Sequence, residues 1–374
     1  MIRLFDFKLG FGFMRLPLIN DNPSDIDYEK VNKLVDCFIK NGGSYFDTGF
    51  HYHNGKSEDA IKKCVIERYP RSKVQIADKM PIYGMRRRDK PEIIFNTQLE
   101  RCGVDYFDYY LIHNTSDIFY NGIAKKLNVF DFASDAKNKG LINHLGISHH
   151  DTADVLKQVL DENPEIEFVQ LQINYIDWLN NAVQAKECYE LVEEYGLDVF
   201  VMEPLKGGNL INVPENVNKL FTNYNQKSPV NWALSYVLNL KSVQLVLSGM
   251  AELEHIKENT EIVKNFNGLD DNQLDIITQA CEIINDTTAI PCTFCDYCAE
   301  HCKKGIPISK YFSIYNDEMN SNVDQMLNFL YYDNYAERYE KASECVSCGA
   351  CEKVCPQHIE ISSELEKVAE LFER

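Results

Sequence analysis

Residues 45–52 read YFDTGFHY: a short apolar run ends on an acid, Asp47, a turn of small residues follows, and an aromatic group ends on a phenol, Tyr52. An acid at the end of a buried strand, with a tyrosine on the following loop, places two ionisable groups at the mouth of one pocket. The same letters also fit an aspartate that caps a helix and is followed by loop aromatics. The flanking segments are therefore needed to distinguish a strand-end acid from a helix cap.

Short apolar runs alternate with longer amphipathic segments from residue 8 to about residue 266. The runs predict strands at Lys8–Phe11, Ser44–Asp47, Val74–Lys79, Tyr106–Ile112, Ile142–Ile147, Phe168–Ile173, Asp198–Met202 and Gln244–Leu247. The segments between them predict helices at Tyr28–Asn41, Ser57–Glu67, Pro91–Cys102, Asp151–Leu160, Ala185–Tyr195, Pro229–Leu238 and Glu252–Phe266. Eight strands alternating with helices over roughly 260 residues predict an α/β fold, a (β/α)8 barrel of the TIM type. A doubly wound open sheet is the alternative, but its glycine-rich phosphate turn is incomplete at Gly10-Phe11-Gly12.

Polar residues gather at the carboxyl ends of these strands, where barrel enzymes build their active sites. In chain order they are Asp47, Lys79, His113, Ser148, Gln170, Asn174 and Glu203. Any one of them fits a capping residue, whereas the whole set predicts an active-site face.

Asp47, Tyr52, Lys79 and His113 have a chemical logic as a set. A phenol with an ordinary pKa near 10 is a weak acid at neutral pH. The Lys79 ammonium would lower the pKa of Tyr52 by stabilising the phenolate, and Asp47 would fix the lysine. His113 would orient a substrate carbonyl, so that Tyr52 protonates its oxygen while a hydride reaches its carbon.

The overall composition excludes several classes of protein. A length of 374 residues leaves room for a barrel of about 250 residues and a smaller module. The net charge of −19 argues against binding nucleic acid or an anionic membrane surface. No run approaches the roughly 18 apolar residues of a membrane span, and residues 1–12 do not resemble a signal peptide. We therefore expect a cytoplasmic protein.

Eight of the 13 cysteines fall in two runs, CxxCxxCxxxC from Cys292 and CxxCxxCxxxCP from Cys345. This is the spacing of bacterial ferredoxins, in which three thiolates of one run and the fourth of the other hold each [4Fe–4S] cluster. Zinc favours other spacings, and a disulfide framework does not suit a chain without a secretion signal. The assignment is Cys292, Cys295, Cys298 and Cys355 for one cluster, and Cys345, Cys348, Cys351 and Cys302 for the second.

The shift in cysteine content predicts a barrel domain at residues 1–281 and a ferredoxin-like domain at residues 282–374. Helical patterns at Ile308–Ile314, Val323–Tyr339 and Glu360–Phe372 predict that the second domain is small and mainly α-helical.

Several motifs resemble the aldo-keto reductase family. They are Phe46-Asp47-Thr48 with Tyr52, Gly55-x-Ser57-Glu58, Asp78-Lys79, Leu111-Ile112-His113 and Gly146-Ile147-Ser148. The resemblance implies that Tyr52 is the general acid/base, Lys79 modulates its pKa, Asp47 pairs with Lys79 and His113 orients the carbonyl. It also implies cofactor contacts: Ser148 and Gln170 with the nicotinamide amide, Met202 with the ring, and Gly249, Glu258 and Asn259 with the adenosine end. A degenerate, non-catalytic barrel is the alternative.

The choice of barrel cofactor stays open. Relative to NADPH-preferring members, Gly249, Met250 and His255 replace basic and hydroxyl residues around the 2′-phosphate, and the acid Glu252 is near. NAD(H) or NADP(H), with the preference in doubt, is expected from the resemblance, and FMN is the alternative. His51 and His53, like His149-His150, have no third ligand at metal spacing and fit a pocket lining better than a metal site.

The cysteine runs, together with MEPLKGG at residues 202–208 and GFGFMRL at residues 10–16, resemble a branch of the family that carries a C-terminal two-cluster ferredoxin domain. The branch implies an oxidoreductase that interconverts a small carbonyl and an alcohol and exchanges electrons with a carrier such as ferredoxin or flavodoxin. A hydride carries two electrons and each cluster accepts one, which favours a flavin as intermediary. The alternatives are an electron-transfer or redox-sensing protein with a non-catalytic barrel, and clusters that only stabilise their domain. The substrate is not readable, since Arg86-Arg87-Arg88 fits an acidic ligand or, more simply, a solvated basic turn.

Overall fold

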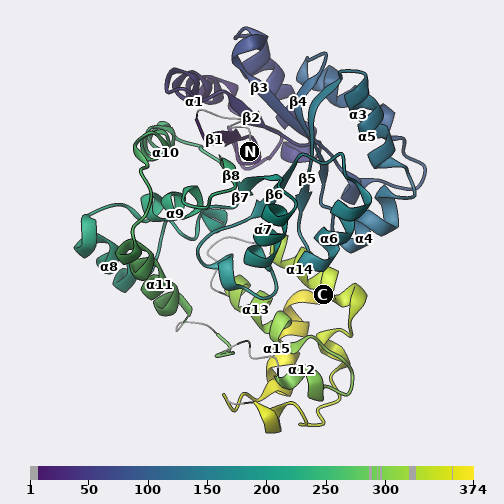
Figure 1. Ribbon diagram of the computed structural model, residues 1–374, viewed down its shortest axis with the longest axis vertical. Coiled ribbons are helices and arrows are strands. Elements are labelled where there is room, and N and C mark those ends of the chain that lie inside the picture. The colour runs from purple at the N-terminus through teal and green to yellow at the C-terminus, as the bar shows by residue number, and fades with distance from the viewer. Residues whose placement is uncertain (1–6, 286–288, 293, 295–296, 320–325, 356) are drawn as a thin grey trace. The chain divides into compact units, whose positions relative to one another are not determined.

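The computed structural model describes residues 7–285, 289–292, 294, 297–319, 326–355 and 357–374. Eight parallel strands form a closed barrel in chain order, and the last strand pairs with the first (Figure 1). They are β1 (Leu9–Gly12), β2 (Tyr45–Asp47), β3 (Gln75–Met80), β4 (Phe107–His113), β5 (Ile142–His149), β6 (Phe168–Gln172), β7 (Asp198–Met202) and β8 (Val243–Ser248). The predicted (β/α)8 barrel is confirmed, with each predicted strand in place.

Helices surround the barrel and build the C-terminal region (Figure 1). Those of the first 265 residues are α1 (Tyr28–Lys40), α2 (Ser57–Ile61), α3 (Pro91–Cys102), α4 (Asp117–Phe119), α5 (Val129–Asn138), α6 (Ala153–Glu162), α7 (Ala185–Glu194), α8 (Glu215–Asn225), α9 (Pro229–Leu238) and α10 (Leu253–Asn265). They continue with α11 (Asp271–Asn285), α12 (Tyr297–His301), α13 (Ile308–Met319), α14 (Met326–Arg338) and α15 (Ile361–Phe372). Five of them, α4, α5, α8, α11 and α12, have no counterpart among the predicted helices.

The barrel axis is filled by side chains. An aromatic layer of Tyr45, Tyr109, Phe168 and Phe200 packs with apolar neighbours, and the rings of Phe168 and Phe200 stack at 4.3 Å. Gly146 makes room for this layer, because a Cβ there would lie 2.5 Å from the Phe168 ring. The barrel is thus a packed core without a pore, and chemistry is confined to its mouth.

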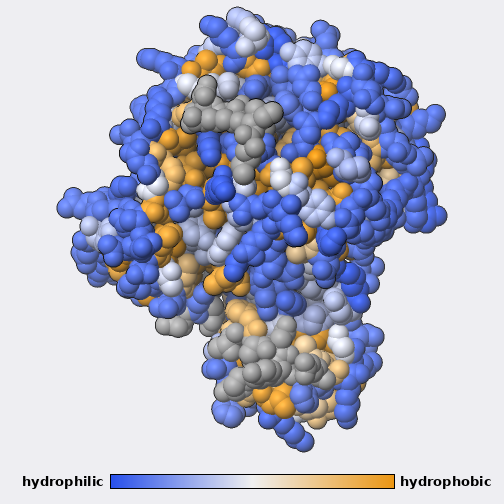
Figure 2. All heavy atoms as spheres, in the orientation of Figure 1, coloured by the Kyte–Doolittle hydropathy of each residue, from blue (hydrophilic) through white to orange (hydrophobic). Residues whose placement is uncertain are grey.

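The chain forms two compact units that do not follow chain order. The first combines residues 1–174, 187–205 and 230–269, and holds the barrel. The second combines residues 270–374 with two loops, residues 175–186 after β6 and residues 206–229 after β7. Hydrophilic side chains cover most of the barrel face seen in Figure 2. None of the helices in the described ranges has the length and apolar character needed to span a membrane.

Within the second unit, the two loops are joined to α13. Lys206 is buried and its ammonium pairs with Asp177 and, at 3.3 Å, with Asp317 of α13. Asn180 donates to the same Asp317 carboxylate at 2.9 Å, and Lys310 donates to the Asn181 carbonyl at 2.7 Å. This buried ion triad of Lys206, Asp177 and Asp317 joins residues far apart in the sequence, and no local motif predicts it.

Candidate active site and cluster site

The four residues of the predicted acid–base set meet at the mouth of the barrel. Asp47 ends β2, Lys79 lies near the end of β3 and His113 ends β4, and these strands are hydrogen-bonded neighbours. Tyr52 opens a short 3₁₀ segment, η1 (Tyr52–Gly55), directly after β2. Parallel strands bring their carboxyl ends to one face, which is why residues far apart in sequence converge here.

Lys79 is the central cation. Its side chain is 1% exposed, and its ammonium pairs with the Asp47 carboxylate and donates to the Thr48 carbonyl at 2.6 Å. The same nitrogen lies 4.9 Å from the centroid of the Tyr52 ring. Burial alone would lower the pKa of Lys79, but Asp47, Tyr52 and Asp78 together outweigh it and raise that pKa. Lys79 is therefore an ammonium at every physiological pH.

Tyr52 differs from expectation in one respect. The sequence argument predicted that Lys79 lowers its pKa, and Lys79 does act in that direction. Burial is the larger effect, however, and the pKa of Tyr52 is raised above the ordinary value of 10.0. The phenol is thus held protonated, as a proton donor requires, and Lys79 acts in the predicted direction without setting the net direction of the pKa.

His113 is held neutral beside the phenol. Its ring lies 6.0 Å from the Tyr52 ring at an angle of 86°. Burial, and then repulsion by Lys79, lowers its pKa well below 6.5. Its Nδ1 is buried and has no hydrogen-bond partner among the described residues. A neutral imidazole in this position can donate one hydrogen bond to a carbonyl oxygen without delivering a full charge.

Two further aromatic residues complete the wall of the site: Tyr83, which the sequence analysis did not assign, and His51, which it expected in a pocket lining. Tyr83 packs against His113 at 5.0 Å, and His51 packs against Tyr83 at 5.2 Å. Tyr83 lies four residues after Lys79 on the loop after β3. Nothing in the sequence pointed to Tyr83, because this residue lies beyond the strand end and loop aromatics occur in many roles.

Ser148 and Gln170, which were predicted to bind a nicotinamide amide, lie on β5 and β6, the two strands that follow β4 in the barrel. His113 ends β4. Ser148 pairs in register with His113 on one side and with Gln170 on the other. The Ser148 hydroxyl accepts from the Asn114 backbone at 3.0 Å. The Gln170 Oε1 is buried without a hydrogen-bond partner among the described residues. An unsatisfied buried acceptor costs free energy, so this atom fits a ligand that donates an N–H.

The other predicted cofactor residues lie at the ends of β7 and β8. Met202 ends β7, and the following residue, Glu203, pairs with Arg15 at 3.0 Å. Gly249 follows β8 and is exposed, while Glu258 lies half-buried on α10. Asn259, also on α10, is buried and donates to Ser248 at 3.1 Å.

Glu252, which was expected to disfavour a 2′-phosphate, has a cationic partner. Lys30 lies 2.5 Å from its carboxylate on the protein surface. The repulsion argued from Glu252 is therefore weaker than the sequence suggested, because an ion pair presents little net charge.

The histidine pairs have structural roles at three of their positions. His53 accepts from the Leu16 backbone at 3.0 Å and its other nitrogen contacts the Pro23 carbonyl at 2.9 Å. His149 bridges Thr115 at 3.2 Å and the Thr152 carbonyl at 3.1 Å. His51 belongs to the aromatic wall. Within the described ranges, no three histidine, cysteine or acidic side chains are grouped as ligands of a single metal ion.

A second buried acid lies behind Lys79. Asp78, the preceding residue on β3, is fully buried and accepts from the Lys79 backbone at 2.8 Å and from the Cys102 thiol at 3.6 Å. Burial, and then repulsion from Glu58, raises the pKa of Asp78 well above its usual range. Gln98 donates to the Lys79 carbonyl at 2.9 Å. This network fixes the strand that carries Lys79.

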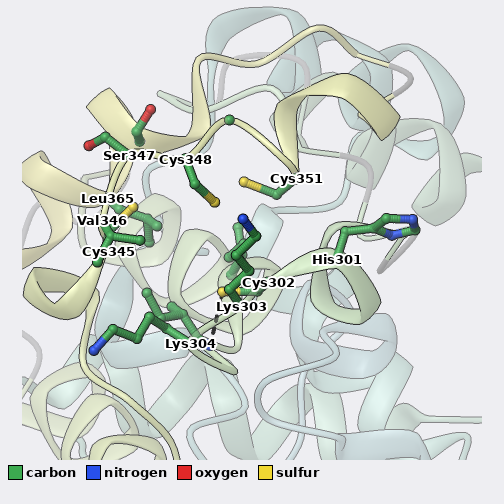
Figure 3. A pocket seen from close by; sticks show the side chains of 14 residues that line it. His301, Cys302, Lys303, Lys304, Cys345, Val346, Ser347, Cys348, Cys351 and Leu365 are labelled. Carbon is green, nitrogen blue, oxygen red and sulfur yellow. Dashed lines mark hydrogen bonds between the residues drawn. The ribbon is translucent and has the colours of Figure 1, made fainter.

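One predicted cluster site is visible as a cysteine-lined pocket in the second unit (Figure 3). Its lining includes all four cysteines that the sequence analysis assigned to the second cluster, Cys302, Cys345, Cys348 and Cys351. Cys302 lies across the pocket from Cys348 and Cys351 in the view of Figure 3. Thiolates arranged around a pocket fit a multinuclear cluster, in which each binds a different iron, better than a single ion.

The Cys302 sulfur also accepts a hydrogen bond from the Ile306 backbone at 3.3 Å. Such N–H···S bonds are one of the levers that set cluster potentials. For the other predicted cluster, Cys292, Cys298 and Cys355 are described, whereas Cys295 lies outside the described residues. The twelve described cysteines are all free of disulfide bonds.

The two parts of the chain match two family models. The aldo/keto reductase family model matches residues 8–282, and a 4Fe-4S dicluster domain model matches residues 291–360. An aldo-keto reductase from Mycobacterium avium is 24% identical over 249 residues, which are 66% of this chain and 81% of that protein. The NADH-specific methylglyoxal reductase of Escherichia coli is 25% identical over 263 residues, 58% of this chain and 78% of that enzyme.

Solved structures show the same fold. The holo form of an aldo-keto reductase from Bacillus halodurans has a TM-score of 0.58 at 23% identity, covering 73% of this chain and 91% of that one. A Klebsiella pneumoniae aldo-keto reductase in complex with NADPH has a TM-score of 0.56 at 16% identity, covering 73% of this chain and 90% of that one. With the match to residues 8–282, the chain belongs to the aldo/keto reductase family, and it is an oxidoreductase of that family with a C-terminal 4Fe-4S dicluster domain.

Proposed function

We propose that this protein interconverts a small carbonyl compound and its alcohol at the barrel mouth, with Tyr52 as proton donor. The observation that carries the proposal is the buried Lys79 ammonium, 4.9 Å from the Tyr52 ring, with the neutral His113 ring 6.0 Å from the same phenol ring. Few structural roles require a buried cation, a protonated phenol and a neutral imidazole around one space.

The chemistry follows from these side chains. A substrate carbonyl oxygen accepts hydrogen bonds from the Tyr52 hydroxyl and from His113. As hydride reaches the carbonyl carbon, negative charge develops on the oxygen, and the Tyr52 proton moves to it. The phenolate left behind is stabilised by Lys79, whose own position is fixed by Asp47 and the Thr48 carbonyl. In the reverse direction the phenolate takes the alcohol proton.

The hydride donor would bind beside β5 and β6. The Gln170 acceptor and the Ser148 hydroxyl fit the amide of a nicotinamide, which supplies hydride when bound; Met202, Gly249, Glu258 and Asn259 would contact the rest of NAD(H) or NADP(H). FMN is the second candidate, favoured by the cysteine-lined pocket, because a flavin passes electrons singly or in pairs. Gln170 does not discriminate between them, since the nicotinamide carboxamide and the flavin ring both carry N–H donors.

The eight cysteines would bind two [4Fe–4S] clusters in the ligand sets given above. These clusters would exchange electrons with an external one-electron carrier such as ferredoxin or flavodoxin. The functional boundary between residues 281 and 282 and the cytoplasmic location are part of the same proposal.

The test begins with anaerobic purification and analysis of iron, sulfide, flavin and nucleotide. Carbonyl turnover is then measured with wild-type protein and with Tyr52→Phe, offering NADH, NADPH or reduced ferredoxin as donor. We expect Tyr52→Phe to reduce kcat by about 10² to 10⁴ with any donor that works. Equal turnover in the two proteins would remove Tyr52 from the mechanism. Flavin in the purified protein would favour FMN over nicotinamide.

The ligand assignment has its own test. Cys302→Ser should lose the iron and the paramagnetic signal of one cluster, whereas Cys37→Ser, outside both runs, should keep both. An unchanged iron content in Cys302→Ser would overturn the assignment of that ligand.

A further inference from the structure

A second pocket opens beside the proposed site, within the barrel unit. It has a volume of about 310 Å³, which lies at the lower end of the range for small-ligand pockets. Phe50 and His51, directly before Tyr52, form one side, and Pro81, which follows β3, forms another. The pocket therefore adjoins the segment that carries Tyr52 and the strand that carries Lys79.

The pocket lining combines apolar side chains with an exposed cationic rim. Met85, Ile93 and Ile94 contribute the apolar lining, while Arg88 and Lys90 contribute positive charge. Neither cation forms a salt bridge with any described residue. The acid at the rim, Asp89, already accepts from the Arg86 backbone at 2.7 Å within its own turn. The pocket also lies at the N-terminus of α3, whose dipole adds positive potential.

A continuous aromatic wall joins this pocket to the proton donors. His51 packs on Tyr83 at 5.2 Å, Tyr83 on His113 at 5.0 Å, and His113 on Tyr52 at 6.0 Å. His51 lies close over Gly84, where a Cβ would be only 2.3 Å from its Nε2. A substrate chain lying along this wall would extend from the proposed carbonyl position toward the pocket.

Resting on the proposed carbonyl chemistry, we propose that the substrate is an acidic carbonyl compound, whose carboxylate or phosphate end binds Arg88 and Lys90 while its chain lies on Met85, Ile93 and Ile94. The overall charge of −19 would repel such a substrate. Arg88 and Lys90 have no acidic partner among the described residues, so they supply local positive charge at a pocket beside the site. An arginine is suited to this task, because its planar fork binds carboxylate and phosphate through two parallel hydrogen bonds.

The test compares matched substrates in holoenzyme. Adipate semialdehyde is compared with its methyl ester, and glycolaldehyde phosphate with glycolaldehyde, in wild type, Arg88→Gln and Arg87→Gln. Arg87 is the control, since it is an exposed neighbour that does not line the pocket. We expect wild type to prefer an anionic member of at least one pair by roughly ten- to a hundredfold in kcat/KM. Arg88→Gln should remove that preference by raising KM with kcat unchanged, and Arg87→Gln should retain it.

A second readout does not depend on turnover. Adipate, which has no carbonyl to reduce, should bind wild type and Arg87→Gln with the same affinity and Arg88→Gln at least tenfold more weakly, by calorimetry. If charged and neutral substrates react equally, or if both arginine variants behave alike, the substrate class is wrong while the carbonyl chemistry stands. If none of the carbonyl compounds reacts but adipate binding still depends on Arg88, the proposed function fails and the anion pocket remains. The carboxylate and phosphate pairs decide which anion the pocket prefers.

Discussion

Two lysines are buried among the described residues, one in each compact unit. Their surroundings differ, and the difference suits Lys79 to the proposed chemistry and Lys206 to a structural role. Lys79 is 1% exposed and has one carboxylate, one backbone carbonyl and a phenol beside it. Lys206 is 7% exposed and has two carboxylates, Asp177 and Asp317. A cation matched by a single acid keeps an influence on a neighbouring phenol. A cation between two acids is fully neutralised and serves to join the segments that carry them.

The largest expected effect is the loss of turnover in Lys79→Met. Removing the ammonium leaves the phenolate of Tyr52 without a partner, so we expect kcat to fall by about 10² to 10⁴. Asp47 loses its partner too, but burial already raises its pKa, so it can take up a proton instead of remaining a buried charge. The measurement is kcat, with the melting temperature as control.

Combining Lys79→Met with Tyr52→Phe sharpens this prediction. Since both residues act on one proton transfer, the double variant should lose little more than either single variant. A Lys79→Met protein that unfolds easily but turns over normally would make Lys79 equivalent to Lys206.

The next effect is a loss of stability in Lys206→Met. Two buried carboxylates would be left without their cation, which costs about 3–5 kcal/mol of unfolding free energy. Trp178 lies in the β6–α7 loop of the same unit, so its fluorescence in a Trp232→Phe background reports this unit during urea unfolding. Lys219→Met is the control, because it removes an exposed ion pair with Glu215 in the same unit and should cost no more than about 1 kcal/mol. Similar losses in the two variants would contradict the triad.

A smaller effect is the pH dependence that Asp317 adds. Burial raises its pKa from 3.8 to about 6, against the opposing attraction of Lys206. Between these values the folded protein binds more protons than the unfolded chain, so the contribution of this group to the unfolding free energy falls as pH rises from about 4 to about 6. The whole change is at most about 3 kcal/mol. In Asp317→Asn, this decrease should be missing from the unfolding free energy measured by urea between about pH 4 and about pH 6. If the variant and the wild type depend on pH in the same way, Asp317 does not cause the decrease.

The smallest expected effect is an absence of change. The proposed carbonyl reduction needs neutral His113 and protonated Tyr52. The pKa of His113 is lowered well below 6.5, so the neutral form is present above that low value, and the pKa of Tyr52 is raised above 10.0, so its proton is lost only above that value. We expect kcat/KM for reduction to have no inflection from either residue between pH 6.5 and 9. An inflection in this range that disappears in His113→Asn would show that His113 titrates there.

The strands and the acid–base set were predictable because both follow local rules. Period-two apolar runs mark strands, and in a parallel barrel their carboxyl ends share one face, so the residue order alone places Asp47, Lys79 and His113 together. The cysteine pocket was predictable for a similar reason, since the ferredoxin spacing encodes which run lends its fourth thiolate.

What could not be predicted depends on long-range packing. The net pKa of Tyr52 is set by how deeply the phenol is buried, and no residue type reports that. Helices α8 and α11 are a different case, because both carry an amphipathic pattern that the sequence analysis did not use. The Lys206 triad joins residues 177, 206 and 317, and each of them alone resembles an ordinary surface charge.

The alternation of Asp78 and Lys79 on β3 has a consequence for how this protein must fold. Successive residues of a strand face opposite sides, so Lys79 reaches the barrel mouth while Asp78 faces the surrounding helices. If β3 paired one residue out of step, an acid would stand beside Tyr52 in place of the ammonium, and the phenol would become harder still to ionise. The hydrogen bond from Gln98 to the Lys79 carbonyl, itself braced by Tyr110 at 2.5 Å, opposes that slip. The sign of the electric field at Tyr52 is thus decided by strand alignment, and we expect a misaligned barrel to lack the proposed activity.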